Sequence, residues 1–303
     1  MPELPEVQTT VNGINKLVTG LKIVETWTDY NSSFHAGKDN IKNPSYFKKF
    51  KKLVEGATIS NSSRRGKNVL IHLSNDHTIL IHMKMTGHLM YGKYEFNGTT
   101  WTPVEKNGPL RDPFNKFIHL VFLLSNNHHL VFSDMRKFAK VFVTPTQELE
   151  HTQDFKNLGL EPLSSDFTYS HFKEQLLKKP QGKIKQVLMD QSLVAGIGNI
   201  YSDEILWDTG LHPESTTNKI PESLFKKMFV STLDTLSKGI DFGGDSTSDY
   251  RNIYGERGSF QHKHNAYRRT GEKCPKKSCT GIILRKVIGG RSGHFCDAHQ
   301  IKF

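Results

Sequence analysis

The spacing of hydrophobic residues along the chain changes twice. Near the start, apolar residues recur every three or four positions, which predicts one helix over about 6–19. From Gly20 to about Val143 they fall instead into short runs rich in Val, Ile, Phe and Thr, divided by polar turns such as SNDH and SNNH. These runs, which include NVLIHL, TILIHMKM and FIHLVFLL, predict an antiparallel β-sandwich or flattened barrel preceded by one helix.

Beyond residue 155 the pattern becomes helical. SHFKEQLLKK, GKIKQVLMDQ, IYSDEILWDT and ESLFKKMFVSTLDTLSKG have apolar residues three and four positions apart, and Gly210 and Gly239 follow two of them at expected C-cap positions. The next stretch, DFGGDSTSDYRNIYGERGS, is polar and rich in Gly and Ser, which is typical of a mobile loop or linker. We therefore expect an α+β chain in three parts, 1–150, 151–254 and 255–303.

The net charge of the chain narrows the classes of possible binding partner. The 303 residues carry a formal net charge of +11, which favours polyanions such as nucleic acid or an anionic membrane. Residues 255–303 contain eleven Lys or Arg against three Asp or Glu. No apolar run approaches the roughly 18 residues of a membrane span, and the N-terminus lacks the features of a secretory signal, so we expect an intracellular protein.

All three cysteines lie in the basic C-terminal segment. Three thiols cannot all pair within one chain, so metal binding is the leading explanation, and unrelated free thiols are the alternative. Cys274 and Cys279 form one short pair, Cys296 and His299 form another, and a strand–turn–strand pattern separates the pairs. This arrangement suits one tetrahedral zinc ion. His294 could compete with His299 as the fourth ligand, although its spacing from Cys296 is less favourable.

A glycine-rich turn, Gly196-Ile197-Gly198-Asn199, lies between two predicted helices. It is not a dinucleotide fingerprint, because Tyr201 stands where the third glycine would be and no parallel strand precedes it. Backbone N–H groups at the start of the second helix, helped by the Asn199 side chain, could hold a DNA phosphate. A tight turn without a ligand explains the sequence equally well.

Basic residues also stand in several loops of the strand region. SSRRGKNVL places Lys67 before a strand, HMKMTG places Met85 at a strand end, and DMRKF places Arg136 near Phe138. A cation beside an aromatic residue suits a nucleic-acid surface. For any one loop alone, an exposed basic turn with packed apolar side chains is the simpler interpretation. The opening MPELPEV likewise suits the start of a helix near Glu6, with proline and acids in the first turn.

Taken together these motifs resemble the Fpg/Nei family of DNA glycosylases, most closely its formamidopyrimidine-DNA glycosylase branch. They are MPELPEV, RRGK, HMKMTG, DMRKF, LMDQSLVAGIGNIYSDEILW and the basic C-terminal finger, in family order across nearly the whole chain. The resemblance implies an N-terminal helix on a two-sheet β-sandwich, a helix–two-turn–helix domain and a zinc finger. It also implies that GGDSTSDY, near residue 243, covers the damaged base.

The resemblance further implies a base-excision-repair enzyme that acts on damaged double-stranded DNA. Such an enzyme removes oxidised purines, 8-oxoguanine and formamidopyrimidines, through a Schiff base followed by β,δ-elimination. After loss of Met1, Pro2 would be the nucleophile, because a free α-amine has a pKa near 8 and is partly neutral at pH 7. Glu3 would act as acid and base, and Glu6 as a supporting carboxylate.

The same resemblance assigns DNA contacts. Lys67 would assist base loss and touch a phosphate, and Arg291 would serve the second elimination. The residues that would fill the gap left by the flipped nucleotide are Met85, Arg136 and Phe138, and those that would bind phosphates are Asn199 and Arg291.

Some positions depart from the family pattern. Met135 replaces a usual proline in the gap-filling loop, Phe117 stands where many members carry a histidine, four residues instead of two separate the first two cysteines, and His299 replaces a cysteine. PELPE, with the Met, Arg and Phe set, favours the purine-specific branch over its pyrimidine-preferring Nei relatives, the nearer alternative. A non-catalytic damage-binding module is the more distant one. We expect a monomer with no membrane partner.

Overall fold

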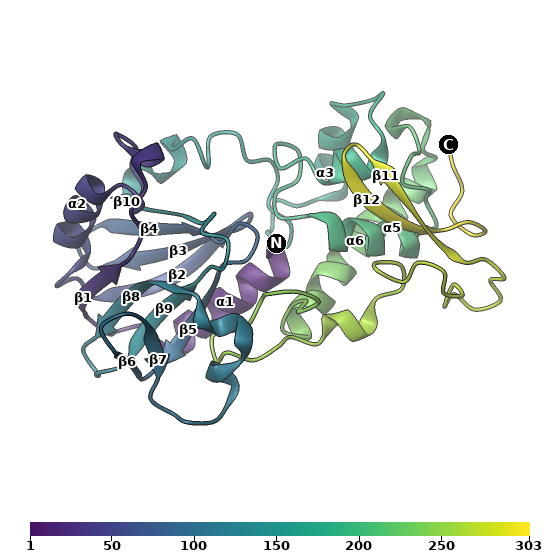
Figure 1. The fold of residues 1–303 in the computed structure, drawn as a ribbon. Coiled ribbons are helices and arrows are strands. Elements are labelled where there is room, and N and C mark those ends of the chain that lie inside the picture. The colour runs from purple at the N-terminus through teal and green to yellow at the C-terminus, as the bar shows by residue number, and fades with distance from the viewer. The chain divides into compact units, whose positions relative to one another are not determined.

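The computed structural model describes residues 1–303, which form two compact units (Figure 1). The first unit comprises residues 1–155 and 242–259, and the second comprises residues 156–241 and 260–303. The chain therefore passes from one unit to the other three times. Residues 242–254 belong to the first unit, whereas the sequence pattern had grouped them with the helical region at 151–254.

The first unit is the predicted β-sandwich. One antiparallel sheet has the strand order β1-β8-β9-β5 and the other has the order β10-β4-β3-β2. Their strands are β1 (Ile23–Thr28), β2 (Ile59–Arg65), β3 (Asn68–Leu73), β4 (His77–His82), β5 (His88–Gly92), β8 (Ile118–Leu124), β9 (His129–Ser133) and β10 (Lys140–Pro145). Apolar side chains from both sheets form one buried cluster, so the core lies between the sheets. A small hairpin, β6 (Tyr94–Phe96) with β7 (Trp101–Pro103), and a helix, α2 (Pro44–Val54), complete the unit.

The N-terminal helix α1 (Leu4–Leu17) lies along this sandwich, where it contacts β2, β3 and β5. It begins two residues before the predicted start at Glu6. Pro5 is compatible with this start, because the first helical N–H groups have no intrahelical acceptor and a proline there loses nothing. Val7, Val11 and Ile14 are almost fully buried, as their spacing predicts, whereas Leu17, at the fourth predicted position, is only half-buried.

The second unit is helical and carries the C-terminal hairpin. Its helices are α3 (Tyr169–Leu177), α4 (Ile184–Leu188), α5 (Asn199–Thr209) and α6 (Glu222–Asp241), and the hairpin pairs β11 (Ile283–Ile288) with β12 (Arg291–Cys296). Gly210 ends α5 at φ +80°, which confirms its predicted capping role. The same prediction for Gly239 is wrong, because α6 continues to Asp241 and buries this glycine in its last turn. None of the helices combines the length and apolar character needed to cross a membrane.

The polar stretch after α6 is a packed part of the first unit and not a linker. Tyr250 and Ile253 are at most 4% exposed, and the Ile253 carbonyl accepts a hydrogen bond from the Tyr91 N–H at 2.8 Å. The polar side chains of Asp245 and Ser246 are also buried. Sequence composition missed this because these residues are held by hydrogen bonds, which leave no hydrophobic periodicity.

Candidate active site and nucleic-acid interface

The residues expected to carry out the reaction lie together at the start of α1. Pro2 is buried, and Glu3, the N-cap residue, is only 2% exposed. The Glu3 N–H donates to Glu6 Oε2 at 2.7 Å, so one acid of the first turn satisfies a helix N–H that would otherwise be unpaired. Two carboxylates thus lie within one turn of Pro2.

Glu6 is fixed from a second direction by the returning segment 242–259. Its Oε1 accepts a hydrogen bond from the Asp245 N–H at 2.7 Å. Gly244 has φ +83°, and a Cβ there would lie 2.9 Å from Glu6 Cγ. Both facts require glycine, because any other residue would be strained and would meet the acid side chain. Tyr250 donates from its hydroxyl to the Glu6 carbonyl at 3.0 Å, and burial raises the pKa of Tyr250, so it remains a donor.

Lys67 lies in the two-residue turn between β2 and β3. Arg65 pairs with Asn68 across this turn, and Gly66 has φ +56°. The turn is tied to α1 because Arg64 donates from Nε to the Gln8 side chain at 3.0 Å and from a terminal guanidinium nitrogen to the Gly66 carbonyl at 3.1 Å. Lys67 is 6% exposed. The hairpin thus fixes the lysine beside the helix that carries Pro2 and Glu3.

A buried carboxylate holds together the two loops that carry Met85, Arg136 and Phe138. Asp134 is fully buried, and its Oδ1 accepts from the Thr86 hydroxyl at 2.5 Å while its Oδ2 accepts from the Ala139 N–H at 2.8 Å. The Thr86 oxygen in turn accepts from the Arg136 N–H at 3.1 Å. The loops are therefore braced by a carboxylate, although Met135 replaces the usual proline.

The tip of the Arg136 loop is exposed, whereas Met85 is half-buried. Phe138 is 52% exposed, and the Arg136 guanidinium carbon lies 4.5 Å from the centre of its ring. Gly87 allows the Met85 loop to close, because a Cβ there would lie 2.4 Å from the Phe132 ring and 2.5 Å from the Met83 carbonyl oxygen. An exposed aromatic ring beside a guanidinium group, on a braced loop, suits insertion into a base stack.

In the second unit, α5 begins at Asn199, as predicted. The Gln191 side chain clamps the preceding glycine turn by donating to the Met189 and Ile197 carbonyls, at 2.8 and 2.7 Å, and by accepting from the Gly196 N–H at 2.9 Å. The buried Oδ1 of Asn199 has no hydrogen-bond partner.

A buried ion pair joins α4, α5 and the hairpin. Lys185 is fully buried and donates to Asp203 Oδ1 at 2.6 Å, and Asp203 Oδ2 accepts from both the N–H and Nδ1 of His294 at 2.9 Å. The turn of the hairpin also packs on α4, because a Cβ at Gly289 would meet the Gln186 amide at 1.9 Å. The hairpin with the exposed Arg291 and the turn before Asn199 therefore belong to neighbouring elements of the second unit.

The four expected metal ligands converge. The ligand atoms of Cys274, Cys279, Cys296 and His299 all lie within 4.8 Å of one another. Zinc–sulfur bonds of about 2.3 Å in a tetrahedron place neighbouring ligand atoms roughly 3.5–3.8 Å apart. The observed separations include 3.5 Å between Cys279 and Cys296 and 3.3 Å between Cys274 and His299 Nδ1.

The surroundings of this cluster also suit a cation. His299 presents Nδ1 to the sulfurs, while its Nε2 lies 3.0 Å from the Trp207 carbonyl, which orients the ring. Burial raises the pKa of the Cys296 thiol to about 11, so a bound cation would be needed to keep it ionised at neutral pH. His294 is hydrogen-bonded to Asp203, and His299, not His294, lies with the three cysteines.

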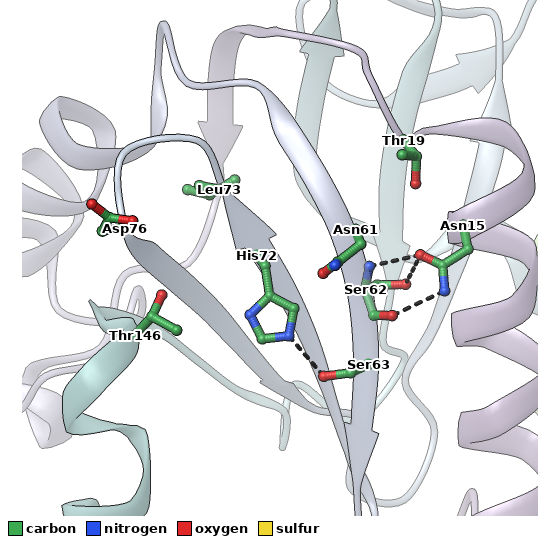
Figure 2. Close-up of a pocket in the computed structure, with 9 residues that line it drawn as sticks. All are labelled: Asn15, Thr19, Asn61, Ser62, Ser63, His72, Leu73, Asp76 and Thr146. Atoms are coloured by element: carbon green, nitrogen blue, oxygen red, sulfur yellow. Dashed lines mark hydrogen bonds between the residues drawn. The ribbon is translucent and has the colours of Figure 1, made fainter.

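One pocket of about 680 Å³ lies away from all these residues (Figure 2). It is lined by polar side chains of α1, β2 and β3, where His72 Nε2 is 2.7 Å from the Ser63 hydroxyl and Asn15 bonds to Ser62. These contacts stabilise the edge of a sheet.

Comparison with known proteins decides the family. Residues 1–141 match the N-terminal domain of formamidopyrimidine-DNA glycosylase, and residues 158–251 match its H2TH domain. The chain belongs to the formamidopyrimidine-DNA glycosylase family. The glycosylases of Bacillus licheniformis and Pelotomaculum thermopropionicum are 35% and 33% identical to it, over 100% and 99% of both chains.

Solved structures of a family member agree with this assignment over the whole chain. Lactococcus lactis Fpg, in complex with DNA that contains an abasic site, is 32% identical, with a TM-score of 0.82 over 99% of this chain and 100% of that one. The same protein in complex with DNA that contains N7-benzyl-Fapy-dG has a TM-score of 0.81. The predicted family, sandwich and C-terminal cluster are thus confirmed.

Proposed function

We propose that this chain is a DNA glycosylase and abasic-site lyase that removes oxidised purines from duplex DNA. The observation that carries the proposal is the start of α1, where Pro2 and two buried carboxylates lie beside the hairpin of Lys67 in a chain that matches formamidopyrimidine-DNA glycosylases over its full length. A net charge of +11 suits the polyanionic substrate.

Removal of Met1 makes Pro2 a secondary amine and starts the chemistry. The neutral amine attacks C1′ of the damaged nucleotide, a C–N bond forms, and the glycosidic bond breaks as the base leaves with a proton. Glu3 supplies and takes up protons at the sugar during ring opening. The resulting iminium ion draws electrons from C2′, so the 3′ and then the 5′ phosphates can be eliminated.

Other residues position the substrate. Lys67 assists base loss and meets a phosphate, and Glu6 holds the start of α1 in register with the segment at Asp245. The gap left by the flipped nucleotide is filled by Met85, Arg136 and Phe138. The phosphates flanking the lesion are bound by Asn199 and Arg291, and Arg291 also serves the second elimination.

The Cys274, Cys279, Cys296 and His299 cluster would hold one zinc ion. The donor set of three sulfurs and one imidazole fits zinc, and the ion would stabilise the hairpin that carries Arg291. The role of the metal is structural, because all four positions are filled by protein ligands.

Borohydride trapping tests the proposal. Processed wild-type protein with duplex DNA that contains 8-oxoguanine opposite cytosine should yield a covalent complex, because borohydride reduces the iminium ion. Glu3→Gln and protein that retains Met1, in which the Pro2 nitrogen is an amide, should lose it, whereas Glu95→Gln, at an exposed strand position, should not. Absence of a trapped complex with any oxidised base would refute the enzymatic proposal, and trapping only with oxidised pyrimidines would favour the Nei-type alternative.

A further inference from the structure

A second pocket in the first unit has an unbalanced set of charges. Its volume is about 530 Å³, and it opens beside Phe138 at the end of the loop that carries Arg136. Four lysines line it, Lys38, Lys42, Lys84 and Lys140, against a single carboxylate, Asp39. No single motif of the sequence contains this site, because its residues come from three separate segments of the chain, although Lys84 lies in HMKMTG and Phe138 in DMRKF.

The partners of these lysines leave much of the positive charge uncompensated. Lys140 is matched by Asp154 at 2.5 Å. Lys42 is only 6% exposed, and its Nζ donates to a neutral group, the Lys137 carbonyl, at 2.6 Å. No carboxylate lies within salt-bridge distance of Lys38, whose Nζ is 4.1 Å from the Phe34 ring centre.

The pKa values of two neighbouring histidines reflect this positive potential. The pKa of His82 is lowered to about 3 by burial, and further by Lys84 and Lys67. The pKa of His35 is lowered by burial, and further by Lys42 and Lys38. The lysines that lower these two pKa values line or adjoin the pocket, and their positive charge suits an anion and not a cation.

Strand pairing places the pocket in line with the Lys67 turn. His82 at the end of β4 pairs with Asn68 of β3 on one side and with Lys140 of β10 on the other. The segment that contains Lys42 lies beyond β10, because the Ile41 N–H donates to the Val141 carbonyl at 3.0 Å. With strands about 4.8 Å apart, the pocket lies roughly 10–15 Å from the Lys67 turn.

We propose that this pocket binds a backbone phosphate of the same duplex, next to the nucleotide whose place Phe138 fills. The proposal rests on the proposed role of the Arg136–Phe138 loop in DNA. A phosphate there would fix the depth and direction of the inserted ring, because phosphate contacts set the register of a protein on DNA and carry no sequence information.

Removal of two charges tests the pocket. In the Lys38→Gln/Lys84→Gln double variant, the Kd for duplex DNA with an abasic-site analogue should rise about tenfold at 0.15 M salt, and the slope of log Kd against log salt should fall by about 1–2. Lys48→Gln/Lys49→Gln is the matched control, because it removes the same charge from exposed positions of α2 and should change both quantities much less. Lys38→Arg/Lys84→Arg should restore binding.

Neutral methylphosphonate linkages locate the contact. Placed singly in either strand within about four nucleotides of the lesion, one linkage should weaken wild-type binding and have no further effect in the double variant. If no linkage shows this coupling, or if the double variant matches its control, the proposal is overturned. At saturating DNA, the double variant should still form the trapped covalent complex. Failure of the wild-type protein to form this complex would therefore count against the proposed function and not against the pocket.

The pocket could instead bind a free small anion that contains phosphate. Titration of inorganic pyrophosphate into the DNA-free protein distinguishes this occupant from a DNA phosphate. Micromolar binding that the double variant loses, together with unchanged DNA affinity, would replace the DNA phosphate with a small anion as the occupant. Millimolar competition between pyrophosphate and DNA, lost in the double variant, would support the duplex.

Discussion

At the scale of single residues, a few buried polar side chains determine where the exposed ones stand. Asp134 is the clearest example, because its two oxygens join the Thr86 loop to the Ala139 end of the neighbouring loop. Gly244 plays the corresponding part at α1, where it lets the returning chain approach Glu6. Neither residue is proposed to touch a reacting atom.

Replacement of Asp134 by alanine should damage both stability and DNA binding. The buried Thr86 hydroxyl and Ala139 N–H would lose their acceptor, which costs about 2–4 kcal/mol in the free energy of unfolding. Urea denaturation measures the loss, and trapping at saturating DNA should still yield the covalent complex. Glu150→Ala, at an exposed position, is the control. Equal stability of both variants would contradict the bracing role.

Gly244→Ala and Gly98→Ala form a matched pair. Both glycines have positive φ, +83° and +91°, but only Gly244 would place a Cβ against a neighbour, Glu6, while nothing lies within 4 Å at Gly98. Each substitution should cost about 1 kcal/mol for the backbone. Gly244→Ala should cost about 1–2 kcal/mol more and slow single-turnover base release. Identical losses in the pair would show that the Glu6 contact is unimportant.

At the scale of elements, short connections place the candidate DNA contacts. The β2–β3 turn holds Lys67, and the turn between α4 and α5 holds Asn199. In both cases a side chain closes the turn, Arg64 in the first and Gln191 in the second. These connections could be located from the sequence, but the side chains that close them could not.

Gln191→Ala should loosen the turn before Asn199. Three hydrogen bonds would be lost, so DNA affinity should fall about threefold to tenfold while the helices themselves remain folded. Fluorescence anisotropy with abasic-analogue DNA measures the affinity, and circular dichroism checks the helices. Gln175→Ala on α3 is the control. Unchanged affinity in Gln191→Ala would argue against a phosphate site at this turn.

Whether an element could be predicted from the sequence depended on the kind of interaction that stabilises it. Helix α1, the strand runs and the Cys/His cluster carry periodic or spaced signals, and all were predicted. The segment 242–259 was misjudged, because Asp245 and Ser246 are buried by hydrogen bonding. Asp134, Gln191 and Lys185 were missed for a related reason, since the partners of a buried polar side chain are set by tertiary contacts. Asp134 lies in the motif DMRKF and Gln191 in the motif LMDQSLVAGIGNIYSDEILW. Membership of these motifs was the only signal in the sequence that could have pointed to either residue.

At the scale of the whole molecule, stability should depend on pH through a buried histidine. His88 is fully buried, and burial lowers its pKa to about 4. The unfolded chain, with a histidine pKa near 6.5, binds a proton first as the pH falls, so the folded state loses stability between about pH 6.5 and pH 4, by up to about 3 kcal/mol. Urea denaturation across this range measures the slope.

The contribution of His88 can be isolated by substitution. His88→Gln removes the titrating group, so its stability should vary less with pH over this range, even if the variant is weaker at pH 7. His151→Gln, at an exposed position, should keep the wild-type slope. A His88→Gln slope as steep as that of wild type would assign the pH dependence to other groups.

Metal removal should affect the second unit selectively. Elemental analysis should find about one zinc per chain, and its loss on chelation or in Cys274→Ala should lower the melting temperature of the second unit and abolish tight DNA binding. The urea midpoint of the first unit should hardly change. Metal-free protein that binds DNA normally would defeat the structural role of the ion.

The return of the chain to the first unit has a consequence for biosynthesis. Glu6 and Asp245, which hydrogen-bond directly, are 239 residues apart in the sequence. At roughly 5–20 residues per second, a ribosome needs on the order of 10–50 s to supply the partner. During that time the N-terminus has left the ribosome but its packing is unfinished, so an aminopeptidase can reach Met1 before Gly244 and Tyr250 arrive. With Pro2 in its proposed role, removal of Met1 would thus activate the enzyme while it is still being made.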